Sequence, residues 1–102
     1  MINIVSKGSN IASVNITGHA GYDEYGKDLV CAAVSTIGIG TLNALDELAN
    51  ESCLLTMKDN EINIRIIKSN EISQLIIKVM LIQLKTLYEQ YKDYIEIKQT
   101  EV

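Results

Sequence analysis

Two long segments with helical spacing of apolar residues alternate with short segments of period-two spacing, and this order constrains the fold most strongly. Ile11–Gly18 and Glu61–Lys68 alternate apolar and polar residues, so both are expected to be strands with one buried face. Apolar residues recur at steps of three and four from about Asp28 to Asn50 and from about Glu71 to Tyr91. That spacing predicts two amphipathic helices.

Shorter apolar runs complete the pattern. Strands are predicted at residues 2–6, 52–57 and 94–98, which gives the order ββαββαβ. A chain of 102 residues is large enough for one core, so residues 1–102 are expected to form a single domain. The predicted fold class is α+β, a two-layer sandwich with two helices on a mixed sheet of about five strands.

The first predicted helix has Asp28 as a plausible N-cap, because a carboxylate accepts hydrogen bonds from the free N–H groups of the first turn. Gly38 and Gly40 inside this helix each cost about 1 kcal/mol relative to alanine. We therefore expect another backbone to approach closely there. The predicted core stripe contains Val30, Val34, Ile37, Thr41, Leu45 and Leu48.

The second predicted helix is apolar on two sides, and its cap is expected at Ser69 or Asn70. One stripe contains Ile72, Leu75, Ile76, Val79, Met80 and Leu87. The other stripe contains Ile77, Leu81, Leu84 and Tyr88. Because so small a domain has one core, we expect a partner to cover the second side, and we predict a homodimer formed through this helix.

Composition and charge exclude several classes of protein. The net charge is −4, with 13 acidic residues against nine Lys and Arg, and no basic stripe is visible, so direct nucleic-acid binding is not expected. The start of the chain lacks the pattern of a signal peptide, and no stretch reaches the roughly 18 apolar residues of a membrane helix. Two cysteines make no disulfide framework. A cytoplasmic protein without membrane contact is the expectation.

The single histidine and one of the cysteines have the chemistry of an activated nucleophile. Cys31 is expected in the first turn of a helix and His19 at the end of the preceding strand. A helix amino terminus and a nearby imidazolium both favour a thiolate, which is the attacking form of a thiol. The hypothesis is that Cys31 attacks a peptide carbonyl and that His19 transfers the proton.

Further residues would support this site. Backbone N–H groups around Cys31 would stabilise the oxyanion, and Ser35 lies one helical turn farther on the same face. Residues Ala20, Gly21 and Gly26 belong to an expected loop that would cover a bound peptide.

From spacing alone, other interpretations stay open. A buried helix cysteine and a loop histidine with no joint role would give the same sequence. A thiol redox enzyme would need a resolving cysteine, whereas Cys53 is 22 residues away in an apolar strand pattern and is expected in the core. One histidine and two distant cysteines fall short of a zinc site, so no metal and no cofactor are expected.

The segments Gly18–Gly21 and Gly26–Ser35 resemble the signature of the ribosomal-processing cysteine protease (Prp) family, which has a Gly-His-Ala segment and a Gly-x-Asp-(Ile/Leu)-Val-Cys-Ala segment. The resemblance implies that His19 and Cys31 are the catalytic pair and that Asp28 and Ser35 are supporting residues. It also implies a small, cytoplasmic, dimeric bacterial enzyme that removes a short N-terminal extension from ribosomal protein twenty-seven of the large subunit.

The resemblance further implies a substrate with a hydrophobic, aromatic-rich segment that is cut before a small residue. The alternative is a non-catalytic, ribosome-associated interaction module that functions through its dimer surface.

Overall fold

The structure is a computed structural model that describes residues 1–18, 25–58 and 61–102, with the backbone alone for residues 25–28. Its element order is ββαββαβ with one added 3₁₀ turn, which confirms the predicted order. The elements are β1 (Ile2–Lys7), β2 (Asn10–Thr17), α1 (Tyr25–Ala49), η1 (Asn50–Ser52), β3 (Cys53–Lys58), β4 (Glu61–Ile66), α2 (Glu71–Gln90) and β5 (Ile97–Glu101).

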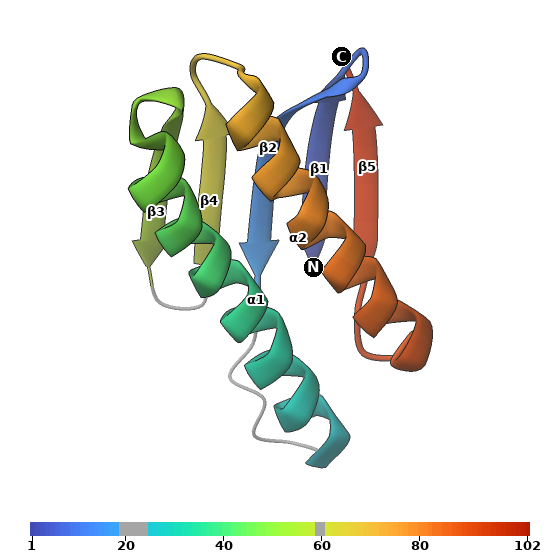
Figure 1. The fold of residues 1–102 in the computed structure, drawn as a ribbon. Helices are drawn as coiled ribbons and strands as arrows, with labels where there is room; N and C mark the ends of the chain where they lie inside the picture. The colour runs from blue at the N-terminus through green and yellow to red at the C-terminus, as the bar shows by residue number, and fades with distance from the viewer. Residues whose placement is uncertain (19–24, 59–60) are drawn as a thin grey trace.

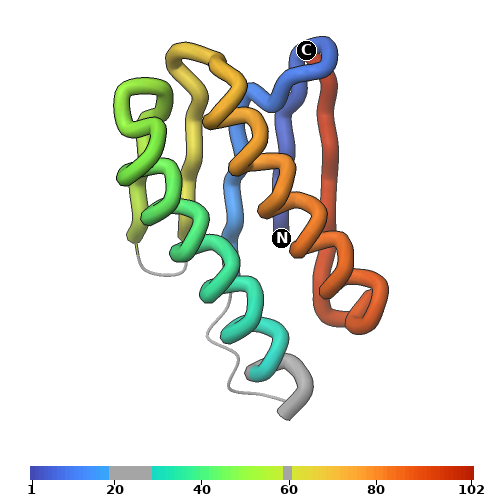
Figure 2. The backbone as a smooth tube through the Cα atoms, in the orientation of Figure 1, coloured from blue at the N-terminus to red at the C-terminus, as the bar shows by residue number. Residues whose placement is uncertain are grey.

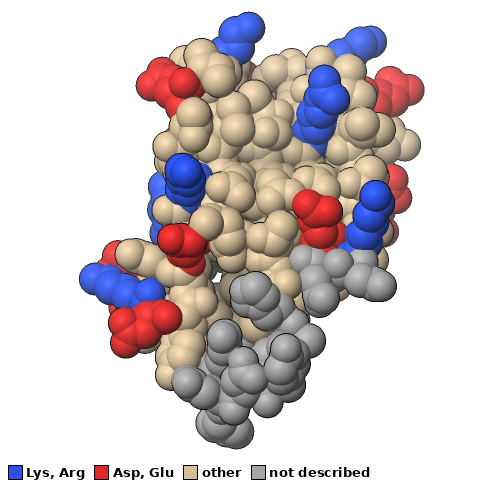
Figure 3. Space-filling model, turned by 180° about the vertical axis from the view of Figure 1, so that it is seen from behind, with Lys and Arg blue, Asp and Glu red and all other residues tan. Residues whose placement is uncertain are grey.

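The five strands form one mixed sheet in the order β3-β4-β2-β1-β5 (Figure 1). Four strands pair antiparallel, whereas β5 runs parallel to β1. Both helices lie on the same face of the sheet, so the molecule has two layers, as predicted (Figure 1). On the opposite face, charged side chains of both signs are scattered around an uncharged centre (Figure 3).

The β1–β2 pair contains a bulge that changes which side chains of β2 enter the core. Ser6 pairs with Ile11 and Val5 with Ser13, so Ala12 is the extra residue on β2. Ile11 is therefore buried on the same side as Val14, although strict alternation would place them on opposite faces. The alternation predicted for Ile11–Gly18 is therefore wrong at Ala12, where the bulge interrupts it.

The buried stripe of α1 differs from the predicted stripe at its carboxyl-terminal end. Leu48 is 64% exposed, whereas Leu42, Leu45 and Ala49 are buried against the rest of the core. A straight α-helix turns 100° per residue, so the contact line passes through Leu42 and Ala49 and misses Leu48. The predicted positions Val30, Thr41 and Leu45 are buried.

Helix α1 packs closely on the sheet at Gly38. A Cβ added to Gly38 would lie 2.7 Å from Cδ1 of Ile62 and 3.3 Å from Cδ1 of Ile16. The approaching atoms are thus side chains of two neighbouring strands rather than the backbone that the sequence suggested. A Cβ at Gly40 would meet nothing within 4 Å, so the same prediction is wrong for Gly40.

Gly38→Val is expected to lower the free energy of unfolding by about 1–3 kcal/mol, because the added carbons overlap the strand side chains. Gly40→Ala is the matched change in the same helix, and it should raise that free energy by about 0.5–1 kcal/mol. Urea unfolding at constant m-value measures both. Equal effects of the two substitutions would contradict the close contact at Gly38.

Helix α2 begins at a capping box and carries apolar residues on two sides. The Asn70 side chain accepts from the N–H of Ser73, and the Ser73 hydroxyl accepts from the N–H of Asn70, which confirms Asn70 as the cap. The side facing the sheet buries Ser73, Gln74, Ile77, Met80, Leu81 and Leu84. The opposite side exposes an outer stripe of Ile72, Leu75, Val79 and Ile82. The stripe of Ile77, Leu81 and Leu84, which a partner was expected to cover, therefore faces the core of the same chain, and that prediction is wrong. Met80, which was predicted in the other stripe, is buried in the core as well.

One helical segment, Leu29–Ser52, is long and apolar enough by length and composition to cross a membrane, in contrast to the sequence expectation. In the structure this segment packs on the sheet through Val30, Leu42 and Leu45. A core helix satisfies the same length and composition test, so this segment is explained by its place in the fold.

The edge of the sheet where β1 begins and β2 ends faces the amino-terminal half of α1. Helix α1 continues past the strand ends at this edge (Figure 2). Met1 is fixed there, because its N-terminal ammonium donates to the Thr17 carbonyl at 2.9 Å and the Thr17 N–H donates back to the Met1 carbonyl at 2.9 Å. These two hydrogen bonds hold the start of β1 and the end of β2 together next to the helix.

Candidate active site

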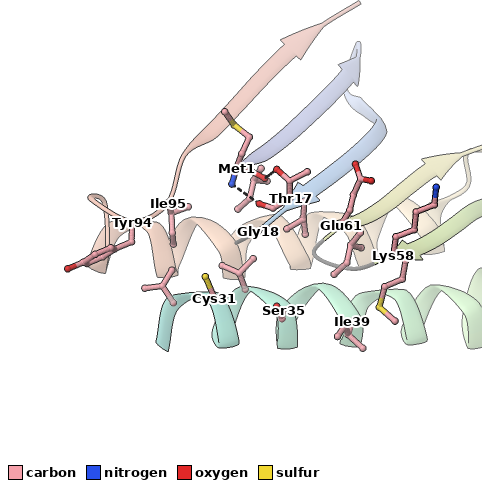
Figure 4. A pocket seen from close by; sticks show the side chains of 16 residues that line it. Met1, Thr17, Gly18, Cys31, Ser35, Ile39, Lys58, Glu61, Tyr94 and Ile95 are labelled. Atoms are coloured by element: carbon pink, nitrogen blue, oxygen red, sulfur yellow. Dashed lines mark hydrogen bonds between the residues drawn. The ribbon is translucent and has the colours of Figure 1, made fainter. Parts of the chain in front are cut away.

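A groove lies between α1 and the strand ends, and it encloses about 180 Å³. Its helical side is formed by Val30, Cys31, Val34, Ser35 and Ile39. The strand side comes from five separate parts of the chain, and its residues are Met1, Ile2, Ile16, Thr17, Gly18, Met57, Lys58, Glu61, Ile62, Tyr94 and Ile95. Figure 4 shows these side chains from close by.

Cys31 and Ser35 lie in this groove together. Their spacing of four residues places them one turn apart on the same side of α1, as predicted. Cys31 is half-buried, and in Figure 4 its sulfur points from the helix toward the strand ends, near Ile95 and Gly18. The sulfur is therefore placed beside a space that can hold a ligand.

The position of Cys31 within α1 corrects the sequence prediction. The helix begins at Tyr25, so Cys31 is in its second turn and not in its first. Asp28 is likewise an internal helical residue and not the N-cap. The difference of three residues exceeds the usual uncertainty of one or two residues in helix ends. The residue that precedes Tyr25 in the sequence is Glu24, which is not among the preferred N-cap types, so no cap signal marked the earlier start.

Because the helix starts earlier, neither its dipole nor its free N–H groups act at Cys31 as predicted. The effect of a helix dipole falls off within the first turn, and Cys31 lies beyond that turn. An N–H in the second turn of an α-helix donates to the carbonyl four residues before it. The backbone around Cys31 is thus engaged within the helix, and the predicted oxyanion hole at a helix start is wrong.

Three predicted site residues, His19, Ala20 and Gly21, lie outside the described residues. Gly18, which precedes them and ends the described part of this segment, lines the groove. Gly26 and Asp28 are described by their backbone alone, which is helical.

Sequence reasoning missed the strand side of the groove. Met57, Lys58 and Glu61 come from the ends of β3 and β4, and Tyr94 and Ile95 come from the connection before β5. The topology brings these distant parts of the chain to one edge of the sheet. The alternating pattern predicts the strands but does not say which ends meet, because strand order is not encoded in the periodicity. No local motif marks these residues.

The second cysteine has a different environment. Cys53, at the start of β3, is 8% exposed and belongs to the hydrophobic core, as predicted. Burial raises the pKa of the Cys53 thiol, because the apolar surroundings disfavour the charged form. Cys53 is therefore a structural residue that stays protonated at neutral pH.

Metal ligands do not gather anywhere in the described part of the chain, where no group of three or more His, Cys, Asp and Glu could hold an ion. The side chain of Glu61, at the groove, instead accepts a hydrogen bond from Nδ2 of Asn15 at 3.0 Å. On the helical side of the groove, Cys31 supplies a thiol and Ser35 a hydroxyl.

Comparison with known proteins identifies relatives over nearly the whole chain. The family model described as "Cysteine protease Prp" matches residues 1–96. The ribosomal processing cysteine protease Prp of Staphylococcus aureus is 34% identical over 96 residues, which cover 91% of each chain.

Solved structures of that Staphylococcus aureus protease have the same fold. A crystal structure of Prp in complex with a covalently linked product peptide is 31% identical, with a TM-score of 0.81, and the match covers 98% of this chain and 100% of the other. A crystal structure of Prp in complex with a substrate peptide is 30% identical, with a TM-score of 0.80 and full coverage of both chains.

Proposed function

The chain belongs to the Prp family and is a cysteine protease, and we propose that Cys31 is its nucleophile and His19 its general base. The observation that carries this proposal is the position of Cys31, whose half-exposed sulfur lines the groove at the edge of the sheet. Cys53, the other cysteine, is buried in the core and unsuited to attack a peptide.

In the proposed reaction, the Cys31 sulfur attacks the carbonyl carbon of the scissile peptide bond, and His19 accepts the thiol proton. The C–N bond then breaks as His19 returns the proton to the leaving amine, which leaves a thioester on Cys31. Water attacks the thioester and releases the carboxylic acid and the free thiol. This sequence consumes one water molecule and needs no cofactor.

Ser35 is proposed to support the reaction through its hydroxyl. The N–H groups around Cys31 are engaged in the helix, so the donor proposed here for the oxyanion is a side chain. Ser35 is exposed and lines the groove one turn from Cys31, so its hydroxyl is available to the same ligand. Asp28 is retained as a proposed supporting residue by the family signature, and Ala20, Gly21 and Gly26 as parts of a proposed substrate loop.

The proposed substrate is the precursor of ribosomal protein twenty-seven of the large subunit, cut in its N-terminal extension. The relatives are ribosomal processing proteases, and the Staphylococcus aureus enzyme has been crystallised with peptides. Such a substrate places the proposed site of action in the cytoplasm.

The test uses the purified chain and a synthetic peptide that spans the start of this ribosomal protein from the same genome. Mass spectrometry should show one cut before a small residue, and a peptide of the same composition in scrambled order should stay intact. A precursor peptide that stayed intact would contradict the proposed substrate.

We further propose that two copies of the chain associate through the outer stripe of α2, defined above. Its four large apolar side chains are exposed, and Leu75 is 65% exposed. The stripe continues into a shallow groove beside α1 that is also lined by Thr36, Gly40 and Ala44. Small side chains there allow a second helix to approach closely, which suits a dimer contact.

Leu75→Glu is expected to raise the dissociation constant of the dimer by about 100-fold or more, because an unpaired carboxylate would be buried at the contact. Sedimentation equilibrium should then report the 11.3 kDa monomer at concentrations where the unmodified chain is dimeric. Lys85→Glu adds the same side chain to an exposed position of α2 outside the stripe and serves as the control. A Leu75→Glu protein that stays dimeric would contradict the proposed interface.

A further inference from the structure

The groove extends well beyond Cys31, and two large apolar side chains lie at its other end. Ile39 is 39% exposed and Met57 is 58% exposed, and both line the groove together with Cys31. Apolar side chains left in contact with water inside a groove are typical of a ligand site. Since the groove is continuous with the nucleophile, its occupant is the peptide that the nucleophile attacks.

The helix gives the distance between the two ends of the groove. Ile39 follows Cys31 by eight residues on α1, and at a rise of 1.5 Å per residue the two positions are separated by about 12 Å along the axis. An extended peptide advances about 3.3 Å per residue. A peptide that follows the groove therefore reaches Ile39 with the side chain three or four residues from the scissile bond.

The charged groups near this end turn away from the helix. In Figure 4 the carboxylate of Glu61 and the amine of Lys58 point away from α1, and the Glu61 carboxylate is held by Asn15 Nδ2 at 3.0 Å. At this end, the part of the groove next to α1 is thus lined by the apolar side chains of Ile39 and Met57. An apolar side chain of the substrate fits this environment, whereas a charged one would be desolvated without a partner.

Packing between α1 and the sheet also fixes the shape of the groove at this end. Gly38, the neighbour of Ile39, is seated against Ile62 and Ile16, which line the strand side of the groove. The contact at Gly38 fixes the distance between α1 and the ends of the strands. The separation between Ile39 and the strand side is therefore set by the core and not by the ligand.

We propose that Ile39 and Met57 form a specificity subsite, which binds an apolar side chain of the substrate three or four residues from the scissile bond. The proposal rests on the proposed function, because it requires that Cys31 cuts peptides in this groove. The two residues act by binding substrate and take no part in the chemical step.

The experiment compares two peptides that share the proposed cleavage site. The leucine peptide carries leucine at the third and fourth positions on both sides of the cut, and the alanine peptide carries alanine at those positions. Ile39→Ala and Met57→Ala are tested on both. The controls are Leu48→Ala in α1 and Leu54→Ala in β3, which truncate exposed apolar side chains of the same two elements outside the groove.

The unmodified chain should cut the leucine peptide with a kcat/KM about tenfold higher or more than the alanine peptide. Ile39→Ala and Met57→Ala should remove most of this preference, chiefly through KM, while the two controls keep it. Equal cleavage of both peptides by the unmodified chain, or a preference unchanged in both groove variants, would overturn the subsite alone. Cleavage of neither peptide would overturn the proposed function and the subsite with it.

Discussion

Cys31→Ser should lower kcat/KM for the precursor peptide by at least about 10⁴-fold, which is the largest effect expected for any substitution in this chain. Sulfur at this position is half-buried and lines the groove, so it is the proposed attacking atom. A hydroxyl is a far weaker nucleophile at neutral pH than a thiol, because it is much harder to ionise. Product formation over hours, followed by mass spectrometry, measures the loss.

Cys53→Ala is the matched control, since it removes the other sulfur from the chain. Cys53 is buried at the start of β3, and burial raises the pKa of its thiol, so it takes no part in attack at neutral pH. We expect activity within about twofold of the unmodified chain and a loss of about 1 kcal/mol in unfolding free energy from the small cavity. Cleavage by Cys31→Ser at the normal rate, or its loss in Cys53→Ala with the fold intact, would refute the assignment of Cys31.

The fold followed from local patterns wherever one periodicity held for a whole element. Ile62 and Ile64 alternate along β4 and are both buried, as period-two spacing requires. The prediction was wrong where the periodicity was interrupted. The bulge at Ala12 brings Ile11 into the core, and no residue type marks such a bulge in the sequence.

The end and the beginning of α1 show two further limits. At the end, Leu48 and Leu42 are equally apolar, and the line of contact with the sheet decides that Leu42 is the buried one. At the beginning, Asp28 is a favourable cap residue, yet the helix starts three residues earlier at Tyr25. Propensity is a weak guide to such boundaries, because tertiary packing overrides it.

The site was predictable only on its helical side. Cys31 and Ser35 share a helical face, and their spacing of four residues is enough to place them together. The opposing residues, such as Met57 at the end of β3 and Tyr94 in the turn before β5, meet the helix because the strand order brings distant parts of the chain to one edge. The sequence pattern predicts a sheet but leaves the order of its strands open. The residues at the far end of the groove could therefore not be predicted.

His19→Ala should lower kcat/KM by about 10²–10⁴-fold, which is the usual contribution of a general base. The position of Cys31 in the second turn of α1 makes this prediction sharper. Cys31 lies beyond the first turn, where the effect of the helix dipole has fallen off, so the proposed base gains in importance. We accordingly expect a loss near the upper end of this range at pH 7.

The pH dependence separates a base from a merely structural histidine. Alkaline solution ionises accessible thiols without a catalytic base. The test compares the rate of iodoacetamide alkylation at Cys31 in His19→Ala with the rate in the unmodified chain. The difference between the two rates should shrink as the pH rises from 7 to 9.5. Peptide mapping distinguishes Cys31 from Cys53, whose burial should keep it unlabelled in the folded chain. A difference that stayed constant over this range would point to a structural role for His19, and alkylation and cleavage at normal rates would remove His19 from the mechanism.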